Sequence, residues 1–261
     1  MFTSNPFAEL SASISPFVMQ TYIVVMIILV AAGTVYETLH KKSAVYFWNN
    51  WRNSTAKGTQ KVGGGEMVSI ALKTAIVDVV ASGEFCSASR RIAHLLTMYG
   101  FLAFVITTAI MVFWYPTPDA AMPAIVAQLW YIGALLVCLG GYWFWFFIRV
   151  DVAAEGNSPF RIMRADLFIL SLLASATFAL VWAYLQATDN SWAIAAFGLH
   201  IIATTVLFGS VPWSKFAHMF FKPAAAFEKR VSAANGSRSN LPAPADKPES
   251  FGGVGHEPRN Y

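Results

Sequence analysis

Five apolar runs, each long enough to cross a lipid bilayer, constrain the fold of this chain more than any other feature of its sequence. The hydrocarbon core of a bilayer is about 30 Å thick, and a helix needs about 20 apolar residues to cross it. The runs lie at about 17–39, 92–114, 124–148, 167–187 and 192–221. Charged residues make up 12% of the chain, which is about half the share in soluble domains. The sequence therefore predicts an all-α integral membrane protein with a bundle of five transmembrane helices.

Basic residues occur on only one side of these runs. All 18 Lys and Arg residues lie between the first and second runs, between the third and fourth runs, or from Lys215 onward. The N-terminal segment and the loops at 115–123 and 188–191 contain none. Because loops rich in Lys and Arg stay in the cytoplasm, we expect an outer N-terminus, a cytoplasmic C-terminus and a multi-pass protein of the cell inner (cytoplasmic) membrane.

Segments outside the spans complete the predicted organisation. Residues 1–16 form an extracytoplasmic N-terminal segment, and residues 17–230 form the five-span membrane domain. Within this domain, residues 66–85 separate polar from apolar side chains and predict an amphipathic helix on the cytoplasmic surface, or a surface helix packed on the bundle. Residues 231–261 are rich in Pro, Gly, Ser and Asn and predict a disordered cytoplasmic tail.

The sequence also argues against several classes of protein. Cys86 and Cys138 lie far apart without a CxxC motif, so they give no disulfide framework and cannot ligate an iron–sulfur cluster within this chain. The net charge of +4 follows from topology and requires no nucleic-acid partner. The first four spans lack both a charge near the midplane and a broken-helix repeat, which disfavours a small transporter.

The fifth run carries a histidine near each end. In a continuous helix, His200 and His218 would project from the same side, five turns and about 27 Å apart. That separation is close to the thickness of the hydrocarbon core, about 30 Å. Pro212 removes one backbone hydrogen bond, so we expect this helix to kink just after Gly209-Ser210.

A second histidine occurs at the same predicted depth as His218. His94 begins the second span, and antiparallel helices bring it level with His218 near the cytoplasmic face. Two facing imidazoles would ligate a six-coordinate b-type haem, whereas two interfacial histidines would bond to headgroups or backbone. Arg90 and Arg91 are placed to pair with haem propionates or an acidic partner, or only to set the topology. The residues alone leave these interpretations open.

Other polar residues near the span ends are candidates for a quinone site. His200 could ligate a second haem, bind a quinone carbonyl or satisfy a backbone carbonyl in the fourth span. Glu37 and His40 are the alternative quinone residues on the inner side, although His40 also fits an interfacial belt of polar and aromatic residues. The sequence does not choose between these sides.

The fifth run resembles the last helix of a known family. His200, the segment Pro212-Trp-Ser-Lys215, His218, Pro223 and the basic end at Lys229-Arg230 carry the likeness. The family contains haem b membrane subunits of the respiratory nitrate reductase gamma subunit type. The stretch ALKTAIVDVV…RRIAHLLTMYGF, residues 71–101, is similar to its heterodisulfide reductase, sulfite-reductase-linked and quinone-interacting branch. The likeness covers about 60–230, and the membrane anchor of adenylylsulfate reductase fits the size and span number.

The resemblance implies a set of haem ligands. The family's proximal haem would take His94 and His218 here, and its distal haem would take His200 and a second histidine of span two. That second position is Phe104 in this chain, so the resemblance predicts one haem near the cytoplasmic face. Met111 on span two offers a thioether at the outer level that could serve as a ligand for a second haem.

The function that follows is electron transfer. We expect a cytochrome b-type subunit that passes electrons between the quinone pool and a cytoplasmic oxidoreductase of sulfur or nitrogen metabolism. The iron–sulfur or flavoprotein centres would belong to partner subunits, so the chain would not be a self-contained enzyme. Without a distal haem, a quinone site on the cytoplasmic side is favoured. The alternative is a haem-free anchor that recruits a soluble redox complex.

Overall fold

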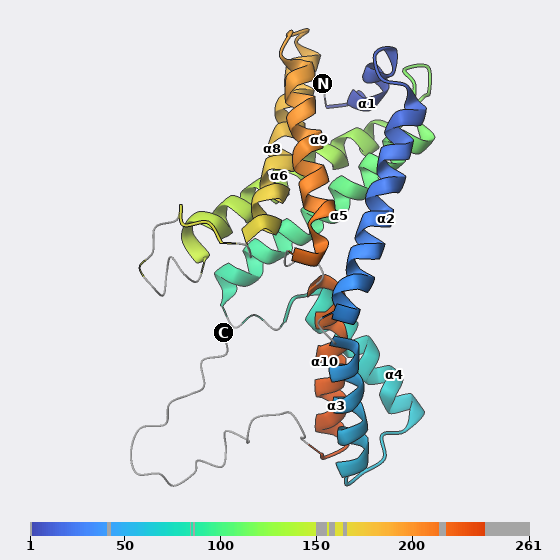
Figure 1. The fold of residues 1–261 in the computed structure, drawn as a ribbon, viewed down its shortest axis with the longest axis vertical. Helices are drawn as coiled ribbons and strands as arrows, with labels where there is room; N and C mark the ends of the chain where they lie inside the picture. Colours follow the sequence, from blue (N-terminus) through green and yellow to red (C-terminus); the bar gives the residue numbers. More distant parts are fainter. Residues whose placement is uncertain are drawn as a thin grey trace.

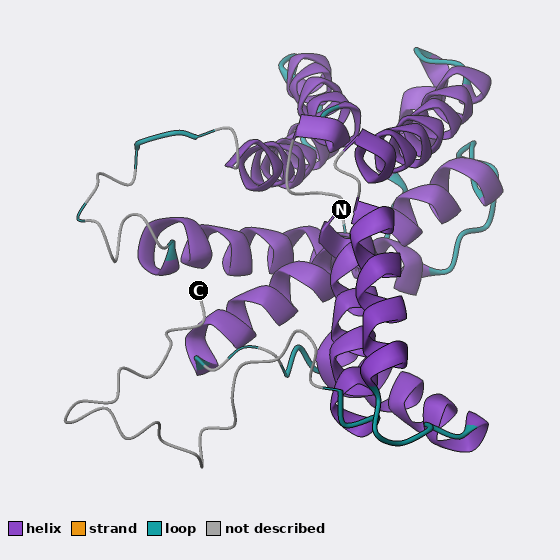
Figure 2. Ribbon diagram, turned by 60° about the horizontal axis from the view of Figure 1, so that its bottom comes forward, coloured by secondary structure: helices purple, strands orange, loops and turns teal. Residues whose placement is uncertain are grey.

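The computed structural model describes residues 2–40, 43–83, 85, 87–149, 156, 160–163, 166–213 and 218–237. Within these ranges all regular secondary structure is helical (Figure 2). Four helical segments are long and apolar enough to cross a membrane: α2 (Pro16–His40), α5 (Ala88–Trp114), α6 (Ala124–Trp143) with its π-helical continuation η3 (Phe144–Ile148), and α8 (Leu167–Ala187). The chain is therefore an all-helical, multi-pass membrane protein, as its sequence predicts.

The fifth apolar run folds differently from the prediction of one kinked helix over 192–221. Helix α9 (Ala193–Gly209) has 17 residues, and a short 3-10 turn η5 (Val211–Trp213) follows it. A new helix, α10 (His218–Ala234), begins at the histidine that was expected to end the span. Pro212 lies in the 3-10 turn, where its missing N–H and its ring prevent the helix from continuing. The separation of about 27 Å expected for a continuous helix does not apply.

Close contacts between backbones hold α5 against α6. A Cβ atom added to Gly100 would lie 2.7 Å from the backbone nitrogen of Val137, and one on Gly133 would lie 2.7 Å from that of Phe104. Small residues let membrane helices approach this closely, and dispersion then stabilises the pair. Helices α8 and α9 pack on this pair, and α2 joins through Gly33, whose Cβ would lie 2.9 Å from Val211 Cβ (Figure 1).

The N-terminal segment folds onto one end of the bundle. Helix α1 (Pro6–Glu9) is capped by Asn5, and the 3-10 turn η1 (Leu10–Ala12) follows it. The Asn5 amide also donates to the carbonyl of Tyr115 at 2.7 Å, just past the end of α5. The Gln186 amide, near the end of α8, donates to the Pro6 carbonyl at 2.8 Å. Residues predicted only as a segment preceding the first span are thus part of the packed bundle.

The opposite end carries the described Lys and Arg residues, and we call it the basic end. It contains helix α3 (Ser43–Lys57), which the sequence analysis missed, together with α10 and the helix α4 (Gly64–Lys73) continued by η2 (Thr74–Val80) (Figure 1). Helical structure runs from Gly64 to Val80, so the helix that the sequence predicts at 66–85 ends before Ala81. The predicted tail boundary at 231 is wrong, because α10 continues to Ala234 and Ser232 and Asn235 are buried. The rest of that tail, from 238, lies outside the described residues.

Candidate functional site: the His94 region at the basic end

His94 lies near the start of α5 and is held by a serine from the preceding loop. Its Nδ1 lies 3.0 Å from the Ser82 hydroxyl, and the Ser82 side chain is only 1% exposed. Two further side chains of α5 hold the same loop. The Arg91 Nε donates to the Ala81 carbonyl at 2.8 Å, and the Tyr99 hydroxyl donates to the Val80 carbonyl at 2.7 Å. The loop and the first turns of α5 therefore form one hydrogen-bonded frame around His94.

Phe85 connects His94 to α10. The ring centroids of Phe85 and His94 lie 4.9 Å apart. On the α10 side, Lys222 Nζ lies 5.6 Å from the centroid of the Phe85 ring. His218 is the first residue of α10 and lies one turn before Lys222, so the backbone brings this helix close to His94. The side chain of His218 is outside the described residues, and its pairing with His94 stays a prediction.

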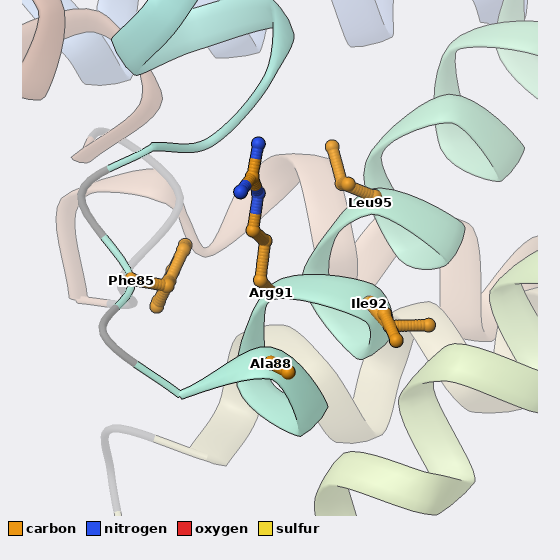
Figure 3. Close-up of a pocket in the computed structure, with 5 residues that line it drawn as sticks. All are labelled: Phe85, Ala88, Arg91, Ile92 and Leu95. Atoms are coloured by element: carbon orange, nitrogen blue, oxygen red, sulfur yellow. The ribbon is translucent and has the colours of Figure 1, made fainter.

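An open cavity of about 410 Å³ lies beside this frame. Its lining combines four apolar residues with one guanidinium: Phe85, Ala88, Arg91, Ile92 and Leu95 (Figure 3). Figure 3 shows the Arg91 side chain extending between Phe85 and Leu95. The volume is within the range of about 300–1,000 Å³ for ligand sites. Of the two arginines singled out in the sequence, Arg91 lines the cavity and Arg90 does not.

The described residues would supply one side of a haem site, with His94 in contact with the lining residue Phe85 but not itself lining the cavity. A histidine that binds a metal through Nε2 usually donates its Nδ1 proton to a neighbouring acceptor, and Ser82 supplies that acceptor. The apolar lining suits a porphyrin, and Arg91 suits a carboxylate. The described residues contain no group of three or more His, Cys, Asp or Glu that could hold a metal ion. A haem with two histidine ligands needs no such group.

His200 lies elsewhere, in the interior of the bundle. Its ring is 4% exposed and stacks on Trp182 at 6.1 Å and 13°. Its Nδ1 lies 2.9 Å from the carbonyl oxygen of Ser175 in α8, so Nδ1 is the donor. Of the three roles left open, the bond to a carbonyl of the fourth span is the one that the structure shows. Phe104 packs edge-on against the His200 ring at 6.2 Å, where the family's second ligand was expected.

The remaining candidates from the sequence, Glu37, His40 and Met111, also lie apart from the His94 region. Glu37 is 6% exposed and lies one turn after Gly33, on the face of α2 that packs against η5. His40 is exposed and stacks on Tyr36 at 5.4 Å, which fits its interfacial interpretation. Met111 is fully buried, and its carbonyl accepts a hydrogen bond from Asn5.

Sequence reasoning missed Ser82 and Phe85 as parts of the His94 region. Ser82 lies within 66–85, a stretch that the sequence predicts as a single amphipathic helix. The adjacent Ser82-Gly83 pair was the available signal, since such pairs mark turns. The contact between Phe85 and Lys222 joins residues about half the chain length apart, and no local pattern could have revealed it.

Comparisons with known proteins are sparse. No family model matches the chain, and no solved structure matches it. Among curated proteins, citrate utilization protein B of Escherichia coli is 26% identical over 160 residues, covering 58% of this chain and 40% of that protein. The chain therefore spans about two fifths of the length of that relative.

Proposed function

We propose that this chain is a cytochrome b-type membrane subunit that carries electrons between a quinone pool and a cytoplasmic oxidoreductase. The observation that carries the proposal is His94, held at Nδ1 by Ser82 beside a cavity lined by Arg91. It lies at the basic end, which the positive-inside rule assigns to the cytoplasm. On this proposal α9 is the fifth span, the N-terminus is outside, and the chain belongs to the haem b family named above.

Two histidines would hold the single haem. His94 would bind through Nε2, and His218 would bind from the first turn of α10. Arg91 would pair with a carboxylate of the porphyrin. When bound, the haem would carry single electrons and divide the two-electron chemistry of a quinone into steps. The iron–sulfur or flavin centres of a sulfur- or nitrogen-metabolising enzyme would lie on partner subunits.

We place the quinone at the basic end. His200 is enclosed by aromatic rings and bonded to Ser175, so a quinone could reach it only by opening the bundle. Glu37 is buried as well, at 6% exposed, but it lies on the face of α2 that packs against η5, at the basic end where we place the haem. Replacing Glu37 with Gln should slow quinone turnover and leave haem content unchanged.

The absorption spectrum of the purified protein tests the proposal. Reduction with dithionite should produce a b-type α-band. His94→Ala and His218→Ala should each abolish it, whereas His40→Ala, an exposed histidine at the same end, should retain it. Unchanged haem content in either of the first two variants would show that the ligands are wrong.

A haem-free membrane anchor is the second candidate function. The Phe85 ring packs directly on His94, and α3 contacts α10 through buried polar groups. An anchor would lack the α-band entirely and still bind its soluble partner in a pull-down from membranes.

A further inference from the structure

We propose that Ser82 is the positioning residue for the haem ligand His94: its hydroxyl accepts the Nδ1 proton and thereby fixes the ring orientation and the coordinating atom. This inference rests on the proposed haem function. Its basis in the structure is the 3.0 Å contact between Ser82 Oγ and His94 Nδ1. Ser82 is buried, with only 1% of its surface exposed.

The backbone at Ser82 is unusual in a way that a purely structural serine would not require. Its φ is +48°, in the left-handed region that favours glycine or asparagine. Among described non-glycine residues, Asp189 also has a positive φ, but it lies in an exposed loop. Ser82 is buried and is followed directly by Gly83. A serine at this strained position retains a hydroxyl that glycine would not supply.

The surrounding hydrogen bonds fix that hydroxyl relative to the ring. Arg91 lies three residues before His94 on α5, and Tyr99 lies five residues after it. Their bonds to the carbonyls of Ala81 and Val80 attach the loop on both sides of His94. The Ser82 hydroxyl is thus held by the same helix that presents the ligand, and its position does not depend on α10.

The bond has a defined electronic consequence. Coordination through Nε2 requires the ring proton to be on Nδ1, and donation of this proton to Ser82 makes the imidazole a more basic ligand. A more basic axial ligand stabilises ferric iron, so the hydrogen bond lowers the midpoint potential of the haem. Removing the hydroxyl should raise that potential without removing the ligand.

The experiment uses two variants that both remove the hydroxyl but differ in backbone strain. Glycine adopts a positive φ without strain, so Ser82→Gly relieves the backbone strain at this position, whereas Ser82→Ala retains it. Both variants should retain close to the wild-type ratio of haem to protein. Their midpoint potential should rise, and the largest g-value of the low-spin ferric EPR spectrum should shift. Ser82→Asn tolerates the same φ and keeps an acceptor, so its potential should stay nearer to wild type. Ser87→Ala, in the exposed part of the same loop, should change nothing.

The outcomes separate this inference from the proposed function. If wild-type protein contains no haem, the proposed function and this inference both fail. If His94→Ala loses haem while both hydroxyl-free variants keep the wild-type potential and g-values, only the role of Ser82 is wrong. A change of midpoint potential in Ser82→Ala that is absent in Ser82→Gly would be caused by backbone strain, and it would also show that the proposed role of the Ser82 hydroxyl is wrong. Loss of haem from all three Ser82 variants would do the same.

Discussion

The membrane bundle and the basic-end unit of α3, α4 and α10 are stabilised by different means. In the bundle, glycines bring α5 and α6 into backbone contact, and aromatic rings fill the space around Trp130 and Trp182. In the basic-end unit, α3 meets α10 through buried polar groups: Ser232 donates to Ser54 at 2.7 Å, and Asn235 donates to Ser54 at 2.9 Å. Close packing of complementary surfaces therefore determines how the helices of the bundle are arranged, and hydrogen bonds determine how α3 lies against α10.

Each region also contains an arginine–aspartate pair, and the two pairs differ in burial. Arg149, at the end of η3, pairs with Asp166 before α8, and its guanidinium lies 4.1 Å from the Trp145 ring centroid. Its side chain is 3% exposed. Arg230 on α10 pairs with Asp78 on η2 at 2.7 Å, with 28% of the arginine side chain exposed. Removing the aspartate from each pair should therefore lower the free energy of unfolding by different amounts.

The largest expected effect is on the buried pair. Asp166→Asn would leave the Arg149 charge buried without its carboxylate, which typically costs about 3–5 kcal/mol. Thermal unfolding in detergent micelles, followed by circular dichroism, measures the loss. A change no larger than that of Asp78→Asn would show that burial does not distinguish the two pairs.

A matched pair of glycine substitutions tests shape fit in the bundle. Gly133→Ala would place a methyl group against the backbone of α5, so we expect a loss of about 1–3 kcal/mol. Gly198→Ala, where the structure leaves open space around the Cβ position, should be neutral or stabilising by up to about 1 kcal/mol. Equal stability of the two variants would contradict the packing of α5 on α6.

A smaller loss is expected from the polar contact of α3 with α10. Ser232→Ala removes a hydroxyl that contacts both Ser54 and Glu228, and it leaves a buried carboxylate oxygen with fewer partners. A loss of about 1–2 kcal/mol is expected, and proteolysis should reach α3 sooner than the bundle. Thr55→Ala, on the exposed face of α3, is the matched control and should leave the cleavage rate unchanged.

The smallest effect is expected from the exposed pair. Asp78→Asn should cost at most about 1 kcal/mol, and salt should reduce its effect further. The hydrogen bond from Arg230 to Asp78 raises the pKa of Arg230 above its ordinary value. A raised pKa means that the arginine's contribution is complete below its ordinary pKa and is lost only as pH rises past the folded value. Unfolding between pH 7 and 9 should therefore show no loss from Arg230 deprotonation.

The contrast between the regions also explains what the sequence could predict. Apolar runs and the distribution of basic residues are local properties, so four spans and the separation of the two ends followed directly from them. Helix α3 has no comparable apolar run. It is stabilised by contacts such as that between Ser54 and Ser232, which lie 178 residues apart in sequence.

The break in the fifth run was only partly predictable. Pro212 indicated a kink, but the close approach of Val211 to Gly33 of α2, just after the end of α9, could not be read from the sequence. At the candidate site, His94 and Arg91 could be selected by residue type and position. Ser82 could not, because its role depends on a turn with a positive φ that brings its hydroxyl back to α5.

Identifying the axial ligands of the haem is the decisive test of whether His94 and His218 hold a haem. Near-infrared magnetic circular dichroism of the oxidised, purified protein distinguishes two imidazole ligands from an imidazole and a thioether. We expect a bis-imidazole spectrum in the wild-type protein and its loss in both His94→Ala and His218→Ala. A spectrum with a methionine ligand, or a protein without haem, would contradict it.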